Sequence, residues 1–293
     1  MSRLPRIQTQ VALTTRHKVA GWADGAHPSS QAGRSLEFHD VREYVRGDDV
    51  SDIDWKASAR RGSLLVKRHV AERRGTLLIA AATGRSMAAM ATPTLHKADL
   101  LIDAAATLAS LALRHGDHVG LLHSRGASTT GGRPSTRGVQ VEQMLAGLDR
   151  ACRPDSPEAD LGHLLGATST SLRRRGIVAL LCGDVDLDGQ SEALLRRLVA
   201  RHEVLVVVVP DLDPTDPALA GRPVVGVGDR RRLPADLLRD PGLAEAWLED
   251  CRERAARRSA SLARLSIASL VLRAADPVVP QVVSLARRMR HAA

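Results

Sequence analysis

Cysteines and long apolar runs are scarce in this sequence of 293 residues, and each shortage excludes a class of protein. The three cysteines are far apart and show no C-x-x-C or mixed His/Cys spacing. This excludes a cysteine-based metal site and predicts buried free thiols in a reducing compartment. The first residues form no continuous apolar stretch, so we expect no signal peptide. Apolar runs such as VLVVVVP are too short to cross a bilayer, which needs about 20 apolar residues.

The usual signatures of catalysis are also missing. The sequence contains no G-x-S-x-G elbow, Walker phosphate loop or G-x-G-x-x-G turn, so we expect no enzyme. The formal net charge of +9 could attract nucleic acid or anionic lipid. Most basic runs, however, fall in the last turns of predicted helices, where cations interact well with the helix dipole. We therefore expect no nucleic-acid binding, and keep an anion- or nucleic-acid-binding protein as the alternative function.

The few aromatic residues are concentrated in the stretch 34–74, which holds Phe38, Tyr44 and Trp55. The same stretch mixes opposite charges: Asp48, Asp49, Asp52 and Asp54 stand near Arg42, Arg46, Lys56, Arg60 and Arg61. Large apolar rings beside acids and bases predict a packed, cross-linked loop system. We expect the ring of Trp55 to be buried and the acids to neutralise the bases, with partner recognition as the alternative role of these charges.

The order of residues in this stretch resembles the signature of the bacterial domain-of-unknown-function-58 family, F-x-x-x-R-E-Y-x-x-G-D-D-x-x-x-I-D-W-K-A-S-A-R followed by K-R-x-x-x-E. The residues that we take as scaffold or partner-binding candidates are Arg42, Glu43, Tyr44, Gly47, Asp48, Asp49, Asp54, Trp55, Lys56 and Arg60. The resemblance implies a von Willebrand factor A-like domain after the signature. It divides the chain into a partly looped N-terminal segment (1–33), a signature segment packed on the main domain (34–74) and the α/β domain (75–293).

The resemblance also implies a partner, because members of this family frequently pair with a MoxR-type AAA+ ATPase. Many of these relatives carry membrane helices before the signature. This chain begins close to the signature and shows no such helix, so we expect a cytoplasmic location.

The pattern after residue 75 predicts the fold independently of the resemblance. Continuous apolar runs at 76–82, 177–183 and 203–210 are typical of strands buried on both faces. Helical patterns separate them, one starting at Thr92-Pro93 and another at Asp240-Pro241. Strands that alternate with helices indicate a doubly wound, mostly parallel sheet with helices on both faces. The segment 124–138, rich in Gly, Ser and Thr, is expected to be a loop or small hairpin.

In a von Willebrand A-like domain, the resemblance places a metal-ion-dependent adhesion site after the first strand, with the motif D-x-S-x-S. The corresponding residues here start at Ala82 and end at Ser86, with Gly84 between them. Ala82 replaces the carboxylate and Gly84 replaces the first hydroxyl. Because Mg²⁺ requires oxygen ligands in near-octahedral geometry, we expect this first motif to be degenerate.

Two further positions match the adhesion site in part. Asp184, after the strand at 177–183, corresponds to its third acidic residue, and Thr136 is a weaker match to its threonine. We expect no cofactor and a vestigial site in which Asp184 pairs with Arg85 or caps a helix. Weak Mg²⁺ binding, a metal-dependent enzyme, and anion binding by the loop 83–86 remain open alternatives. The favoured function is a non-catalytic protein-interaction module that assists a MoxR-type AAA+ ATPase in chaperone-like assembly or activation.

Overall fold

The computed structural model describes residues 3–15, 38–45, 48–69, 75–234 and 240–291. The chain divides into two compact units. Residues 1–25 and 75–293 form the first, here called the main unit, and residues 26–74 form the second, here called the signature unit. Helix α1 (Arg3–Thr14) therefore belongs to the main unit. That the signature segment packs on the main domain stays a prediction.

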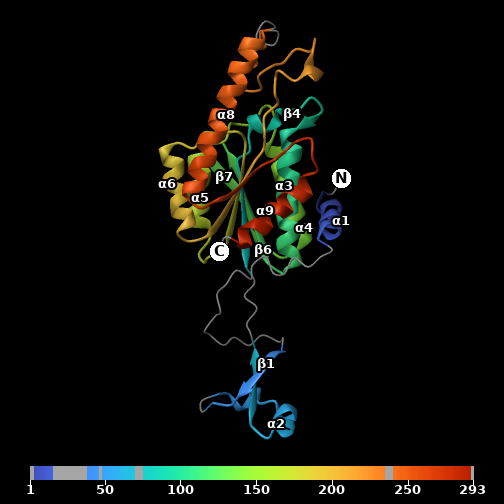
Figure 1. Cartoon of the computed structure of the whole chain (residues 1–293), viewed down its shortest axis with the longest axis vertical. Coiled ribbons are helices and arrows are strands. Elements are labelled where there is room, and N and C mark those ends of the chain that lie inside the picture. Colours follow the sequence, from blue (N-terminus) through green and yellow to red (C-terminus); the bar gives the residue numbers. More distant parts are fainter. Residues whose placement is uncertain (1–2, 16–37, 46–47, 70–74, 235–239, 292–293) are drawn as a thin grey trace. The chain divides into compact units, whose positions relative to one another are not determined.

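Six strands form the central sheet of the main unit, in the order β10-β9-β8-β3-β6-β7 (Figure 1). They are β3 (Thr76–Ala81), β6 (His118–Arg125), β7 (Ser128–Ser135), β8 (Ile177–Cys182), β9 (Glu203–Val208) and β10 (Ala268–Val271). The pairing of β6 with β7 is antiparallel and every other pairing in this sheet is parallel. This is the strand order of a doubly wound sheet. With one antiparallel edge strand it has the von Willebrand A-type topology, which confirms the predicted fold class.

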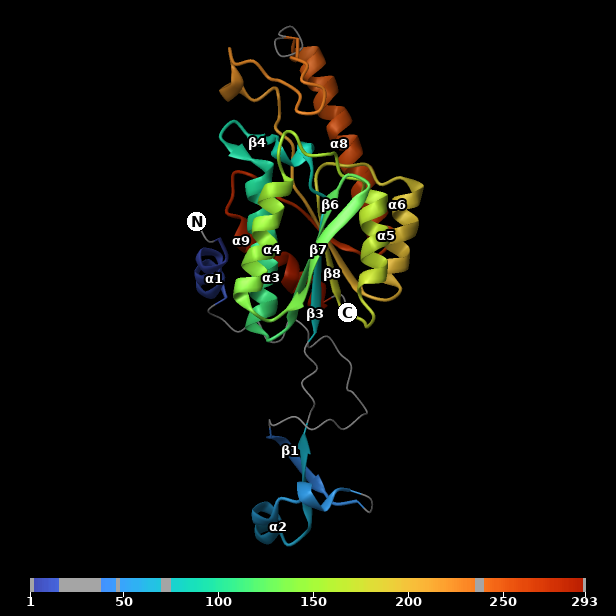
Figure 2. The same cartoon turned by 180° about the vertical axis from the view of Figure 1, so that it is seen from behind.

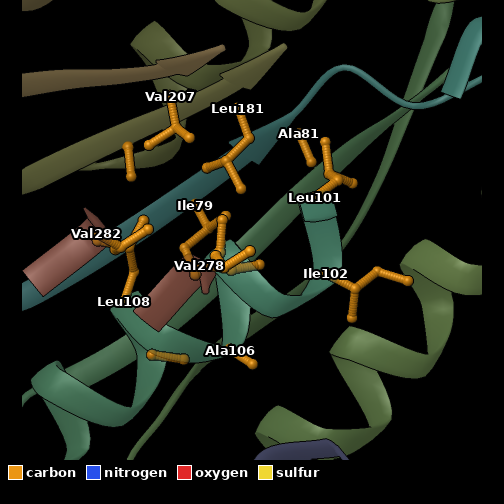
Figure 3. Packing of buried hydrophobic residues seen from close by; sticks show 14 of the residues in the cluster. Ile79, Ala81, Leu101, Ile102, Ala106, Leu108, Leu181, Val207, Val278 and Val282 are labelled. Carbon is orange, nitrogen blue, oxygen red and sulfur yellow. The ribbon is translucent and has the colours of Figure 1, made fainter. Parts of the chain in front are cut away.

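Helices cover both faces of this sheet, as Figures 1 and 2 show from opposite sides. One face carries α1, α3 (Lys97–Arg114), α4 (Gly138–Ala151) and α9 (Val278–His291), and the other carries α5 (Leu161–Ser171), α6 (Gly189–Val199) and α8 (Pro241–Arg264). Alternate residues of β3 enter the two cores: Leu77 and Ile79 pack on the first side, Leu78 and Ala80 on the second. Figure 3 shows Ile79 among side chains of α3 and α9. The continuous apolar runs were thus correctly predicted to be strands buried on both faces.

Two connections differ from the sequence-based expectation. The polar segment predicted as a loop or small hairpin forms β7, which pairs with β6 at the edge of the sheet. An edge strand with a solvent-facing side does not require apolar residues, so the polar composition of this segment did not indicate a strand. The helix predicted to start at Thr92 starts at Lys97 instead, because Met90–Thr92 (β4) and Leu95–His96 (β5) form a small antiparallel hairpin.

The described residues of the signature unit form one antiparallel strand pair and one short helix. Strand β1 (Phe38–Glu43) pairs with β2 (Leu65–His69), and between them lie a 3₁₀ turn (Val50–Asp52) and helix α2 (Trp55–Arg61). Ile53, Leu65 and Val66 are buried. The hydroxyl of Ser58 links α2 to β2, since it accepts a hydrogen bond from the backbone amide of Leu65 at 2.8 Å.

Within the parts of the chain that the structure describes, no helix is both long and apolar enough to cross a lipid bilayer.

Candidate functional site

The strand order places a candidate site at the carboxyl ends of β3 and β8. In sequence, the strands from β3 onward are added first on one side of β3 and then, from β8, on the other. Ligands of doubly wound sheets bind outside the carboxyl ends of the strands at such a switch point. The residues after β3 and after β8 meet here, because the amide of Ala82 donates to the carbonyl of Leu181 at 2.8 Å. We call this region the carboxyl edge.

The first loop of the carboxyl edge is closed by its own backbone and offers few oxygen ligands. Ala82 is buried, and the hydroxyl of the buried Thr83 donates to the backbone carbonyl of Ser124 at 2.7 Å. Gly84 has a φ of 144°, a conformation that favours glycine. A Cβ at this position would lie 2.6 Å from the carbonyl oxygen of Pro157. The loop after α4 therefore occupies the space that a serine at this position would need.

An internal carboxylate fills the anion-binding position of the same loop. The amide of Ser86 donates to Oε2 of Glu158 at 3.2 Å, and Nε of Arg85 lies 3.8 Å from the same oxygen. The 3₁₀ turn that starts at Arg85 is only four residues long. Glu158 thus makes the contacts that we had considered for a bound anion, and sequence reasoning had not identified it.

Asp184 forms an ion pair with Arg258 of α8. The guanidinium of Arg258 is almost fully buried, with 4% of its side chain exposed, and 21% of the Asp184 side chain is exposed. The prediction that Asp184 pairs with Arg85 or caps a helix is wrong. Arg85 reaches Glu158 instead, while the last turns of α8 bring Arg258 to Asp184, which follows β8. Asp184 is the one carboxylate that matched the adhesion motifs, and its ion pair with Arg258 takes up its charge.

A second buried cation lies at the same edge. Lys97, the first residue of α3, has only 2% of its side chain exposed and pairs with Asp211, which follows β9. A Cβ added to Gly183 would lie 3.2 Å from Nζ of Lys97, so the ammonium group is held against the end of β8. The apolar pattern of α3 gave no sign that its first lysine is buried, and sequence reasoning missed both members of this pair.

Thr136 is not brought to the carboxyl edge. It follows β7, whose last residue, Ser135, pairs with Val119 near the start of β6. Since β6 runs parallel to β3, this is the amino-terminal side of the parallel strands. A strand residue advances about 3.3 Å, so several residues separate Thr136 from the ends of β3 and β8. The prediction that Thr136 corresponds to the adhesion-site threonine is therefore wrong, because this residue lies at the opposite end of the sheet.

The remaining residues do not fit a hard divalent cation. Ala82 and Gly84 supply no side-chain oxygen, the Asp184 carboxylate is bound to Arg258, and the ammonium of Lys97 adds a positive charge. Mg²⁺ requires about six oxygen ligands. Elsewhere in the described ranges, no cluster of three or more His, Cys, Asp or Glu side chains has the arrangement of a metal site.

The acids of the signature unit stabilise local turns. Asp54 caps α2, since its Oδ1 accepts from the amides of Lys56 and Ala57 at 3.1 and 3.0 Å. Asp49 caps the 3₁₀ turn through the amide of Ser51 at 3.0 Å, and Asp48 accepts from the amide of Val45 at 2.9 Å. These contacts fix the backbone of the signature.

Trp55 is exposed, and the prediction that its ring is buried is wrong. It is the first residue of α2, directly after the capping Asp54, and 64% of it is exposed. The buried residue of this helix is Ser58, whereas the tryptophan at its first position stays exposed.

The other signature candidates are partly placed. Lys56, Arg60 and Glu43 lie on the surface and Tyr44 is half-buried. Gly47 and the side chain of Arg42 lie outside the described residues. The prediction that Arg42 or Arg60 forms a charge-assisted contact with Asp48, Asp49 or Asp54 therefore stays a prediction.

Comparison with known proteins gives consistent matches. The family model described as protein of unknown function DUF58 matches residues 40–231. Uncharacterized proteins of Mycobacterium bovis and Mycobacterium tuberculosis are 30% identical over 257 residues, which cover 86% of this chain and 78% of theirs.

Among solved structures, an aerotolerance-related membrane protein from Bacteroides fragilis is 13% identical and has a TM-score of 0.45, over 74% of this chain and 99% of that one. A von Willebrand factor type A protein from Catenulispora acidiphila is 11% identical and has a TM-score of 0.38, over 78% of this chain and 43% of that one.

Proposed function

This chain belongs to the DUF58 family of proteins of unknown function, and we propose that it is a non-catalytic protein-interaction module that acts in the cytoplasm. We further propose that its partner is a MoxR-type AAA+ ATPase, which it assists in chaperone-like assembly or activation. The choice of partner rests on the family resemblance of the signature. The three cysteines are free thiols, as expected for a protein of a reducing compartment.

The observation that carries the proposal is the exposure of Trp55. A tryptophan that is not needed in a core and is held on a capped helix resembles the anchors of protein interfaces, in which Trp and Arg are enriched. The same unit exposes three further apolar side chains, Val45, Val50 and Leu64. Exposed apolar side chains that gather into one patch are typical of a contact region for another protein.

The charged residues on α2 suit the rim of such a contact. Lys56 and Arg60 are exposed on the same short helix as Trp55, while Asp54 is engaged in capping it. Protein interfaces combine an apolar centre with a polar, solvent-accessible rim. The positive residues would favour an acidic surface on the partner and increase the rate of encounter at low salt.

The carboxyl edge supports the non-catalytic part of the proposal. The charged side chains at this edge have partners within the protein. Asp184 pairs with Arg258 and Lys97 pairs with Asp211, while Glu158 accepts a hydrogen bond from the backbone amide of Ser86. A general acid, base or nucleophile must be able to reach a substrate proton or carbon. The groups at this edge instead satisfy internal partners.

The basic surface gives less support to the nucleic-acid alternative. Along α8, Arg252, Arg254 and Arg257 pair with acids three or four positions earlier in the helix. Phosphate-dominated binding would weaken steeply with salt, whereas a packed protein interface need not. A salt series on any captured partner therefore separates the two functions.

The test is capture of a partner from a lysate of cells that naturally produce the protein, with and without ATP. We expect the full chain to retain an AAA+ ATPase, identified by mass spectrometry. Trp55→Ala should lose at least about tenfold of the captured partner, since hot-spot truncation costs about 2 kcal/mol or more. Leu243→Ala, an exposed apolar residue on α8, is the matched control and should capture normally.

Two results would contradict the proposal. One is equal capture by the Trp55→Ala variant and the wild type. The other is wild-type capture of nucleic acid, and of no protein, with steep loss as salt rises.

A further inference from the structure

The two members of the ion pair between Lys97 and Asp211 differ in how far they are exposed to solvent, and this difference points to a binding site. The ammonium is buried, with 2% of the side chain exposed, whereas 49% of the Asp211 side chain is exposed. A buried ammonium is costly unless a partner compensates its charge. The cation is therefore fixed inside the protein, and its anion approaches from the solvent side.

The surrounding structure holds the ammonium at the switch point of the sheet. The amide of Lys97 donates to the carbonyl of Ala89 at 2.9 Å, which fixes the start of α3 to the hairpin that precedes it. The side chain then extends to Gly183, where any Cβ would lie 3.2 Å from Nζ and 3.1 Å from Cε of Met87. A side chain at position 183 would therefore press on the lysine head at the end of β8.

The neighbouring groups cannot neutralise this cation in place of Asp211. Asp184 is bound to Arg258. Burial raises the pKa of the Cys182 thiol to about 12, against the opposing effect of the nearby positive charges, so the sulfur stays a neutral thiol at pH 7. Among the described residues, Asp211 is the carboxylate that pairs with Lys97.

We propose that the carboxyl edge is a carboxylate-binding site in which the ammonium of Lys97 supplies the positive charge and Asp211 is an internal occupant that an external carboxylate can replace. The external ligand is an Asp or Glu side chain of an acidic protein segment. This site goes beyond the proposed contact of the signature unit and does not depend on Trp55.

The chemistry favours a carboxylate over other ligands. An ammonium group is a compact point charge with three donors, so it binds a single carboxylate without the planar geometry that a guanidinium imposes. The group that already occupies the site is itself a carboxylate. Asp211 belongs to a chain segment that is fixed by the bond from the Leu212 amide to the Met90 carbonyl at 3.1 Å, so exchange requires only the Asp211 side chain to rotate away.

Chemical rescue of an Asp211→Ala variant tests this site with acetate as the probe. Removal of the carboxylate leaves the Lys97 ammonium buried without its partner, so the melting temperature should fall. Sodium acetate should then raise the melting temperature of the variant in a saturable way, relative to sodium chloride at equal ionic strength. Wild-type protein should respond less and only at higher acetate concentration, because acetate must first displace Asp211.

The double variant Lys97→Met/Asp211→Ala is the matched control, since methionine keeps an unbranched chain without the charge. It should melt above Asp211→Ala and should not respond to acetate. If Asp211→Ala does not fold, Asp211→Ser carries the same comparison, since it also removes the carboxylate and leaves room for acetate.

Three outcomes would overturn the proposal. The first is the absence of acetate rescue in the folded single variant. The second is an equal response in the double variant. The third is equal rescue by sodium phosphate at matched ionic strength, which would indicate a general anion effect rather than a carboxylate site.

Discussion

The carboxyl edge and the signature unit use the same residue types for opposite purposes. At the carboxyl edge, Asp184 and Arg258 are drawn into a largely buried pair across 74 positions of sequence. In the signature unit, Asp54 bonds to amides only two and three positions away, and Trp55 beside it is exposed. Long-range pairing neutralises the buried charges of the edge within the protein, whereas local capping fixes the short helix on which Trp55 is exposed.

The largest effect should come from breaking the buried pair. Asp184→Ala leaves the guanidinium of Arg258 buried without its counter-charge and should lower the free energy of unfolding by about 3–5 kcal/mol. The double variant Asp184→Ala/Arg258→Met should lose less than the single variant. Urea denaturation of both variants gives the comparison.

The control for this pair is on the surface of α8. Arg252→Ala removes a pair with Glu249 in which both side chains are more than half exposed. Its free energy of unfolding should change by no more than about 1 kcal/mol. Equal losses for Arg252→Ala and Asp184→Ala would show that the edge is not internally fixed as described.

Restoring the first adhesion motif should damage the loop rather than recover a metal site. Gly84→Ser introduces a Cβ at a φ of 144° and 2.6 Å from the Pro157 carbonyl oxygen. Backbone strain of this kind costs about 1–3 kcal/mol. Ala82→Asp together with Gly84→Ser should therefore not recover a metal site, because this loop cannot keep its geometry with a side chain at position 84. Thermal unfolding of Gly84→Ser should show the loss, while Ser86→Ala, in the same loop, should melt close to wild type.

Acid should weaken the main unit through His202. Burial, and then the charges of Arg201 and Arg175, lower the pKa of this histidine, and neither ring nitrogen has a hydrogen-bond partner. Below about pH 6.5 the unfolded chain binds the proton first, so stability is full above that value and falls as the pH drops toward the lower folded pKa. Unfolding curves from pH 8 to 5 should show this loss, and it should be smaller in His202→Gln. An identical pH dependence in the variant would contradict it.

The smallest stability effect belongs to the residue that we expect to matter most for partner binding. Trp55→Ala should change the free energy of unfolding by no more than about 0.5 kcal/mol, because the ring is exposed. Burial would have cost about 3–5 kcal/mol. Met87→Ala, which is 1% exposed in the main unit, is the contrast and should cost about 2–5 kcal/mol. A large loss for Trp55→Ala would show that the ring is packed after all.

The sequence allowed the fold to be predicted wherever a local pattern decides the structure. The run IVALLC became β8, buried along its whole length, and Asp240-Pro241 became the capped start of α8. Such signals act over a few residues, so they can be read without knowing the tertiary contacts. β7 was missed because an edge strand made of Ser, Thr and Gly has no apolar alternation.

The candidate site could be predicted only in part, for the same physical reason. The resemblance placed the candidate site after the first strand of the α/β domain, and the sequence showed the loss of ligands at Ala82 and Gly84. It could not identify Arg258 or Lys97, whose acidic partners lie 74 and 114 positions away. It also misjudged Trp55, since the direction of that ring depends on which face of a seven-residue helix packs inward. Which charged residues pair, and which side chains become buried, is decided only by the tertiary contacts of the folded chain.

The central claim is that the carboxyl edge carries its own cations in place of a metal, and the most direct measurement is calorimetric titration with Mn²⁺ and Mg²⁺ at millimolar concentration. The account predicts no saturable heat of binding for the wild-type protein, because Asp184 and Asp211 are bound to Arg258 and Lys97. Saturable binding in the wild type that disappears in Asp184→Asn would contradict it.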